Sequence, residues 1–308
     1  MSIGYITHHL CQLHDMGSYH PEQPARLVAI NDRLIATGLD MALRQYDATP
    51  ASREQVLAAH GADYVAEVYR KSPEHGHVSL DGDTSMNPYT LQAALLAAGA
   101  VVQAVDRVMS DEIKQVFCGV RPPGHHAERD KAMGFCLFNN VAVGAYHALQ
   151  QHGLERIAIV DFDVHHGNGT EDIVSGDERF LFCSTFQHPL YPHSGVDTQA
   201  NNIVNVPLPA GCSGGDFRTA VSEQWLPRLA EFQPQLVMVS AGFDAHQADP
   251  LADFNLVDDD FAWVTRRLCE QAEQSAQGRL VSSLEGGYDL HALARCVEAH
   301  LKAMLGDS

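Results

Sequence analysis

Short apolar runs alternate with longer helical segments along most of the chain, and this alternation constrains the fold more than any other feature. The runs have strand length and are rich in β-branched residues, and they cover residues 115–120, 156–160, 180–183, 202–206, 235–240 and 279–284. The segments with helical spacing cover residues 89–109, 140–151, 217–231, 258–274 and 290–304. Strands that alternate with helices form a mainly parallel sheet covered by helices on both faces. The sequence therefore predicts an α/β fold.

The length of 308 residues fits one α/β domain, so residues 1–308 are expected to form a single unit. A hydrophobic fraction of 45% is enough to fill a sizeable core. No apolar run approaches the roughly 18 residues that a membrane helix needs, so no membrane association is expected. The start of the sequence does not resemble an export signal, which favours a cytoplasmic location.

The formal net charge of −19 argues against a nucleic-acid partner, because phosphate binding requires clustered Lys and Arg, and only 20 of these residues are spread through the chain. The negative charge fits a cationic or neutral substrate, and the alternative is that it only keeps the protein soluble. The seven cysteines are never spaced as C-x-x-C, so neither a disulfide framework nor a thiolate zinc site is indicated.

Four polar stretches directly follow apolar runs. In a parallel sheet, ligands bind beyond the carboxyl ends of the strands, so these stretches are expected to carry the functional residues. They are RPPGHHAERDKAMGF (Arg121–Phe135), DFDVHHGNG (Asp161–Gly169), AGFDAHQADP (Ala241–Pro250) and EGGYDL (Glu285–Leu290).

The second stretch has the residue types and spacing of a metal site. Along an extended chain every second side chain points the same way, so Asp161, Asp163 and His165 are expected to share one face. A catalytic zinc ion takes three protein ligands and leaves one position for water, and Asp244, after the neighbouring run, is the natural third donor. A single Asp at a strand end is more often a helix cap, and Asn168 stays a candidate cap for a helix that begins near Gly169.

The first and fourth stretches offer acid–base groups. His125 and His126 follow a rigid Pro-Pro-Gly turn, and Asp161 and Asn168 are available as their partners, one charged and one neutral. Tyr288 follows two glycines, which leaves its phenol free to donate a hydrogen bond to a developing oxyanion. A metal, a base and an oxyanion donor together indicate hydrolysis.

The chain resembles the zinc-dependent histone deacetylase family, which has an arginase-like fold, a three-layer sandwich. The resemblance runs in order from HPEQPARL (His20–Leu27) to LEGGYDL, and its other motifs are RPPGHHA, GFCLFNN, DFDVHHGNGTEDI and SAGFDAHQADPL. Asn168, where class I enzymes carry Asp, together with LEGGYDL, is similar to class II-type enzymes and bacterial histone deacetylase-like amidohydrolases. Tyr288 stands where the poorly active class IIa branch has His, which favours an active enzyme.

The resemblance implies a role for each site residue. Asp163, His165 and Asp244 would be the ligands of one Zn²⁺. His126 would be the general base and acid, and His125 would stabilise charge beside it, with Asp161 supporting His125 and Asn168 supporting His126. Tyr288 would hold the tetrahedral intermediate. The resemblance also implies a structural K⁺ ion near Asp161 and Ser184, and it places Arg26 beside the cavity that releases acetate.

The resemblance also implies the substrate. Gly134, Phe135 and Tyr191 match a narrow channel that holds the methylene stem of a lysine. The expected activity is removal of acetyl or other short acyl groups from N-acyl-lysine peptides, proteins or related acyl-amines. Polyamine-selective relatives carry an acidic residue at the position of Leu251, so an acetylpolyamine substrate is disfavoured and remains an alternative.

Two further alternatives belong to other classes. A ureohydrolase of the arginase type holds two manganese ions through Asp-x-His-x-Asp, but here Gly167 follows His165, and His246 stands where the second motif has Asp. His246 is interpreted as a supporting or surface residue. A non-catalytic module that binds acyl-lysine would not need Tyr288 and His126. The sequence leaves the physiological substrate, the acyl length and the oligomeric state open.

Overall fold

The computed structural model describes residues 3–306, and eight strands in this range form one parallel sheet. The strand order is β2-β1-β5-β10-β9-β6-β7-β8. The strands are β1 (Ile3–Thr7), β2 (Leu43–Asp47), β5 (Gln115–Cys118), β6 (Ile157–Asp161), β7 (Phe180–Gln187), β8 (Ile203–Leu208), β9 (Leu236–Ala241) and β10 (Leu280–Leu284). Two short antiparallel strands, β3 (Val78–Ser79) and β4 (Ser85–Met86), form a separate ribbon.

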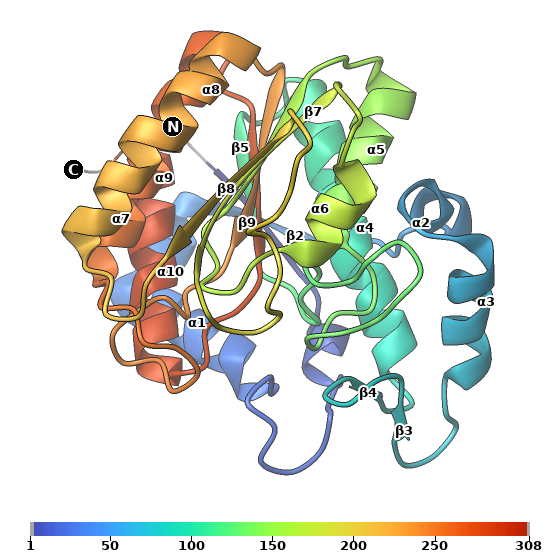
Figure 1. Ribbon diagram of the computed structural model, residues 1–308. Coiled ribbons are helices and arrows are strands. Elements are labelled where there is room, and N and C mark those ends of the chain that lie inside the picture. The colour runs from blue at the N-terminus through green and yellow to red at the C-terminus, as the bar shows by residue number, and fades with distance from the viewer. Residues whose placement is uncertain (1–2, 307–308) are drawn as a thin grey trace.

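Helices cover both faces of the sheet (Figure 1). One layer contains α1 (Ala25–Thr37), α7 (Gly214–Ala220), α8 (Leu226–Phe232), α9 (Asp258–Ser275) and α10 (Leu290–Leu305). The other contains α2 (Arg53–Ala59), α3 (Ala62–Lys71), α4 (Thr90–Met109), α5 (Asn140–His152) and α6 (Asn168–Val174). The predicted three-layer α/β fold with a mainly parallel sheet is confirmed.

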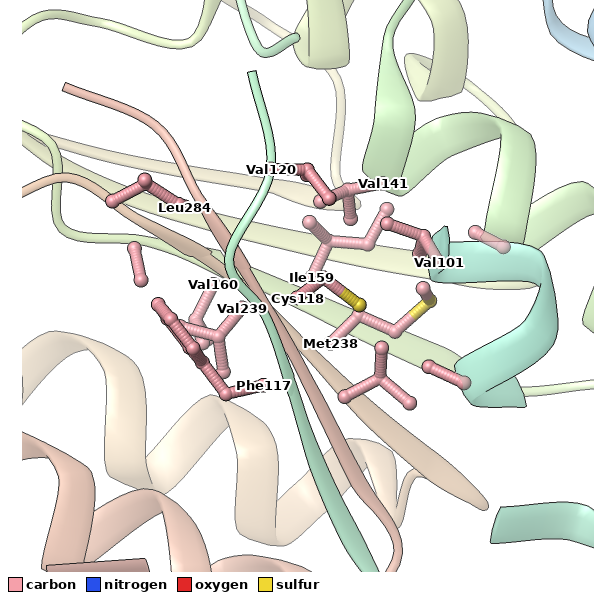
Figure 2. Close-up of a cluster of buried hydrophobic side chains, with 14 of the residues drawn as sticks. Val101, Phe117, Cys118, Val120, Val141, Ile159, Val160, Met238, Val239 and Leu284 are labelled. Atoms are coloured by element: carbon pink, nitrogen blue, oxygen red, sulfur yellow. The ribbon is translucent and has the colours of Figure 1, made fainter. Parts of the chain in front are cut away.

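The central strands are buried on both sides, as expected for a parallel sheet between two helical layers. Figure 2 shows Cys118, Ile159 and Met238 of β5, β6 and β9 on the side of the sheet that faces Val101 of α4 and Val141 of α5, and Phe117, Val160 and Val239 of the same strands on the opposite side. The strands β5, β6, β9 and β10 contain only buried residues. They therefore form a rigid base for the loops at their carboxyl ends.

Helix α4 corrects one expectation from the sequence. It is 20 residues long and apolar enough to cross a membrane by length and composition, although no such run was expected. In the structure, 67% of its apolar stretch is buried inside the protein, and it packs against α5 and β5. Because its apolar side chains are covered by the protein itself, α4 has the character of a core helix.

Several elements were not predicted, and the first part of the chain contains most of them. Strand β2 carries mostly exposed polar residues because it is an edge strand. Strand β1 is only five residues long and contains Gly4, where an added Cβ would lie 3.0 Å from Val116 Cγ2 of the neighbouring strand. Helices α1, α2 and α3 were also missed, and α2 and α3 have ten residues or fewer. Helix α6 begins at Asn168, one residue before the start expected near Gly169.

The helix predicted over residues 217–231 is divided in the structure. A π-helical turn, Val221–Trp225, joins α7 to α8, and Pro227 lies in the first turn of α8. Proline has no backbone N–H and its ring collides with the preceding turn, so the wider π turn accommodates it.

The strand order changes direction between β6 and β9. The chain continues from β6 to β7 on one side, and from β9 to β10 on the other. At such a point the two connections diverge and leave a crevice beyond the carboxyl ends of the strands. The residues after β6 and β9 therefore meet in this crevice.

Candidate metal centre and active site

Asp163, His165 and Asp244 form a buried cluster in the crevice beyond β6 and β9. The Nδ1 atom of His165 lies 3.1 Å from Asp163 Oδ1 and 3.1 Å from Asp244 Oδ2. One potential ligand atom of each residue lies within 4.8 Å of the others. The structure thus brings together the three residues that the sequence suggested as metal ligands.

The remaining carboxylate oxygens of this cluster are held by the backbone. Asp163 Oδ2 accepts a hydrogen bond from the Gly286 amide (2.8 Å), and Asp244 Oδ1 accepts one from the Val164 amide (3.0 Å). Each acid therefore has one oxygen fixed by the scaffold and one oxygen directed towards His165. This arrangement fits a single cation that takes one oxygen from each acid and the nitrogen of the imidazole.

The charge of the cluster also requires a cation. Burial alone would lower the pKa of His165, but its hydrogen bonds to Asp163 and Asp244 outweigh burial and raise this pKa to about 10. Two buried carboxylates thus attract a positive charge, either a proton on the imidazole or a metal ion.

The expected common face of Asp161, Asp163 and His165 is only partly correct. Strand β6 ends at Asp161, and the chain turns before it reaches His165. Alternation therefore does not continue beyond the strand, and Asp161 points to a different partner: its Oδ2 lies 2.9 Å from Nδ1 of His125. Asp163 and His165 converge because of the loop geometry.

Two adjacent histidines lie beside the cluster, each with its own partner. The rings of His125 and His126 are 4.0 Å apart between centroids. Nδ1 of His126 lies 2.7 Å from Oδ1 of Asn168. Nδ1 of His125 lies 2.9 Å from Oδ2 of Asp161. The interpretation of Asn168 as a helix cap is wrong, because Asn168 is the first residue of α6 and Gly167 occupies the N-cap position without a side-chain bond.

The two histidines differ in charge preference. Burial lowers the pKa of both imidazoles, but Asp163 and Asp161 outweigh it at His125 and raise that pKa well above its usual value. At His126 burial acts together with the neighbouring His125 and His165, and this pKa lies well below its usual value. The two buried imidazoles therefore differ because acids outweigh burial at His125, whereas two neighbouring histidines add to burial at His126.

A cavity of about 220 Å³ leads to these residues. All four residues predicted to contact substrate line it, and so do His126, His165 and Tyr288; the four are Gly134, Phe135, Tyr191 and Leu251. Tyr191 packs edge-on against His126 at 5.3 Å, and Phe135 packs edge-on against Tyr288 at 5.9 Å, both between ring centroids. Burial raises the pKa of Tyr288 well above its usual value, so its phenol keeps its proton.

Two glycines let the backbone approach this site closely. A Cβ at Gly286 would lie 2.1 Å from Asp244 Oδ2, so only glycine lets this amide reach the acids. Gly134 has φ +56°, and a Cβ there would lie 2.4 Å from His126. The glycines of GFCLFNN and LEGGYDL are therefore steric requirements of the site.

Three acids that sequence reasoning did not single out support the site. Asp83, between β3 and β4, lines the cavity, and its Oδ1 accepts a hydrogen bond from the Gly134 amide (3.1 Å). Asp249 Oδ2 accepts a hydrogen bond from the Tyr288 amide (2.7 Å). Glu285 Oε2 accepts hydrogen bonds from the amides of Gly124 (2.6 Å) and His125 (3.1 Å). Asp249 and Glu285 lie inside two of the polar strand-end stretches, whereas no sequence signal marks Asp83.

The other residues named from the sequence lie around the site. Arg26 is buried, donates to the Gly287 carbonyl at 2.7 Å, and lies 5.0 Å from the ring centroid of Tyr288. His246 is outside the metal cluster, and its Nε2 lies 3.2 Å from Asp258 Oδ1. Ser184 is the register partner of Asp161, and its buried Oγ has no hydrogen-bond partner in the described part of the chain.

Comparisons with known proteins agree with this geometry. The model of the histone deacetylase domain matches residues 20–304. A probable deacetylase from Archaeoglobus fulgidus is 38% identical over 94% of this chain and 82% of its own length. The human protein named polyamine deacetylase HDAC10 is 38% identical over 93% of this chain and 45% of its own length. The crystal structure of the HDA15 HD domain superposes with a TM-score of 0.93 at 33% identity, covering 100% of this chain and 90% of the other.

Proposed function

The chain belongs to the histone deacetylase family, and we propose that it uses one zinc ion to remove acetyl or other short acyl groups from N-acyl-lysine side chains. The observation that carries the proposal is the convergence of Asp163, His165 and Asp244 at the end of a cavity lined by His126 and Tyr288. The deacetylase relatives support the reaction class.

The donor set fits zinc, since one imidazole and two carboxylates are ligands that catalytic zinc sites use. When bound, such an ion polarises a carbonyl and lowers the pKa of a water molecule. Asp163, His165 and Asp244 would hold it. A structural potassium ion is the second proposed cofactor, because the buried Ser184 Oγ needs a partner and lies next to Asp161 in the sheet.

The chain's own groups supply the proton transfers. His126 is neutral at neutral pH because its pKa is low, so its imidazole can accept a proton from the attacking water, with Asn168 fixing the ring. His125, next to Asp161, supplies positive charge nearby. The Tyr288 phenol keeps its proton and can donate a hydrogen bond to the oxyanion that forms on the substrate carbonyl.

The cavity wall supports an acyl-lysine substrate. Phe135, Tyr191 and Leu251 present apolar surface that suits a methylene stem. Asp83 adds a carboxylate to the lining, where it can accept a hydrogen bond from an amide or an ammonium group of the substrate. Leu251 carries no charge, which disfavours a polyamine as the preferred substrate although one relative is named a polyamine deacetylase.

The proposal is tested with acetyl-lysine peptides, in the presence and absence of a chelator, on zinc-loaded protein. We expect turnover that the chelator removes and that zinc restores. A non-catalytic acyl-lysine module would bind the peptide without releasing acetate, and that result would overturn the proposal.

The substrate class is tested by comparing acetyl-lysine peptides with acetylputrescine. We expect the wild type to prefer the peptide. The Leu251→Glu variant should shift the ratio of the two kcat/KM values towards the polyamine by roughly fivefold, because a partly exposed ion pair contributes up to about 1 kcal/mol. A wild-type preference for acetylputrescine would show that the charge at this position does not select the substrate.

A further inference from the structure

A second group of potential metal ligands lies between α4 and α5. The Nε2 atoms of His147 and His152 lie 2.7 Å and 2.8 Å from the same oxygen, Oδ1 of Asp106. Asp106 belongs to α4, and both histidines belong to α5. The two helices pack side by side in one layer of the fold (Figure 1).

This group lies far from the active site in the architecture. Asp106 and His152 are near the C-terminal ends of α4 and α5, and these ends lead into the first residues of β5 and β6. They therefore belong to the edge of the sheet where the strands begin, whereas the active site lies where the strands end. No residue is shared between the two sites.

The three donor atoms converge from different directions. The imidazole rings of His147 and His152 are 5.7 Å apart between centroids and inclined by 76°. One potential ligand atom of each residue lies within 4.8 Å of the others. Two imidazole nitrogens and one carboxylate oxygen are the ligands that Zn²⁺, Ni²⁺, Co²⁺ and Cu²⁺ prefer, whereas Mg²⁺ and Ca²⁺ prefer oxygen alone.

The burial of the three side chains is graded, from 8% exposed for His147 to 25% for His152 and 52% for Asp106. His147 is thus fixed by packing, and Asp106 leaves the group open to solvent. Both histidines lie within hydrogen-bond distance of one oxygen of Asp106, so this carboxylate is placed as a ligand shared with both imidazoles.

From this geometry we propose that Asp106, His147 and His152 form a second site for a divalent transition-metal ion, which links α4 to α5. The ion replaces the two N–H···O hydrogen bonds by three metal–ligand bonds, and each imidazole then carries its proton on Nδ1. Water from the exposed side completes the coordination. An ion that binds only the folded chain stabilises the fold, so this site couples metal availability to stability.

The test is calorimetric titration with Ni²⁺ of protein loaded with one zinc ion per chain, combined with thermal unfolding with and without Ni²⁺. The central variant is Asp106→Asn, which keeps an oxygen acceptor for both histidines but removes the charged ligand. His152→Ala is the second variant, chosen because this side chain is more exposed than His147 and its removal disturbs packing less. His75→Ala is the matched control, since His75 is exposed and lies outside every potential ligand group in residues 3–306.

We expect the wild type and His75→Ala to bind one additional Ni²⁺ per chain and to gain thermal stability. Asp106→Asn and His152→Ala should each bind it at least about tenfold more weakly and lose the gain in Tm. Equal Ni²⁺ affinity in the wild type and in both variants would overturn the proposal, and so would a wild type that takes up no additional ion, because the group then makes hydrogen bonds only. The comparison does not depend on catalysis, so it separates this site from the proposed deacetylase activity.

Discussion

The two histidine–carboxylate groups of this protein use the same donor atoms in opposite settings. The group at the carboxyl edge of the sheet has two acids and one histidine, is buried, and has carboxylate oxygens held by the amides of Gly286 and Val164. The group between α4 and α5 has one acid and two histidines, and its Asp106 is 52% exposed. Water can compensate the exposed acid, whereas only a bound cation or proton can compensate two buried acids. The buried group therefore depends on a bound cation far more than the exposed group does.

The largest predicted effect tests the buried group directly. Asp244→Asn removes one of the two charges that hold the ion, and the loss of several kcal/mol of charge stabilisation lowers kcat/KM by about 10³-fold or more. The measurement is steady-state deacetylation together with the zinc content of the same sample. Full activity in a zinc-free Asp244→Asn protein would contradict the assignment of this ligand.

The next effect concerns Tyr288, the proposed hydrogen-bond donor to the oxyanion. Tyr288→Phe keeps the ring that packs against Phe135 but removes the hydroxyl, so kcat should fall by about 10²- to 10³-fold. Zinc content and peptide affinity should stay close to the wild-type values. If kcat is unchanged, Tyr288 is a packing residue and the oxyanion is stabilised elsewhere.

A smaller effect is expected from the acid that holds the tyrosine loop. Asp249 accepts hydrogen bonds from the amides of Tyr288 (2.7 Å) and Leu251 (3.0 Å). The Asp249→Ala variant should therefore misplace the Tyr288 phenol and lower kcat by about 10- to 100-fold. Asp249→Asn retains an oxygen acceptor and should recover most of the rate. A positioning role predicts that kcat falls while zinc content stays constant; a fall in both would instead indicate general loss of structure.

The smallest effect is expected for a substitution in the exposed group. Asp106→Asn lies in the exposed group, far from the catalytic cavity, and should change kcat/KM by less than about twofold, because surface substitutions of this kind have small effects. The same assay used for Asp244→Asn provides the comparison. A large loss of activity in Asp106→Asn would show that the two groups are coupled.

The sequence predicted the architecture well where the strands are buried. Runs of mainly apolar residues identified β5, β6, β9 and β10, because a strand covered on both faces is mostly apolar. It failed for β2, whose exposed edge position leaves a polar pattern, and for the division of the helix at Pro227, which depends on a π turn.

The site was predicted through its motifs, and the errors arose where local geometry decided the outcome. Alternation grouped Asp161 with Asp163 and His165 on one face, but β6 ends at Asp161. The resemblance had implied that Asp161 supports His125 and Asn168 supports His126, and both pairs lie within hydrogen-bond distance. Asn168 does not cap α6. Asp83 joins the cavity through a long-range approach of the loop between β3 and β4, which no sequence spacing encodes. The roles of these residues in catalysis and the cytoplasmic location remain predictions.

In the proposed reaction, one ion held by Asp163, His165 and Asp244 is required for catalysis. The most direct measurement compares zinc content with kcat/KM across samples from which zinc has been removed to different degrees. We predict that activity is proportional to zinc up to one ion per chain and reaches zero in the metal-free protein. Full activity in metal-free protein would contradict the claim.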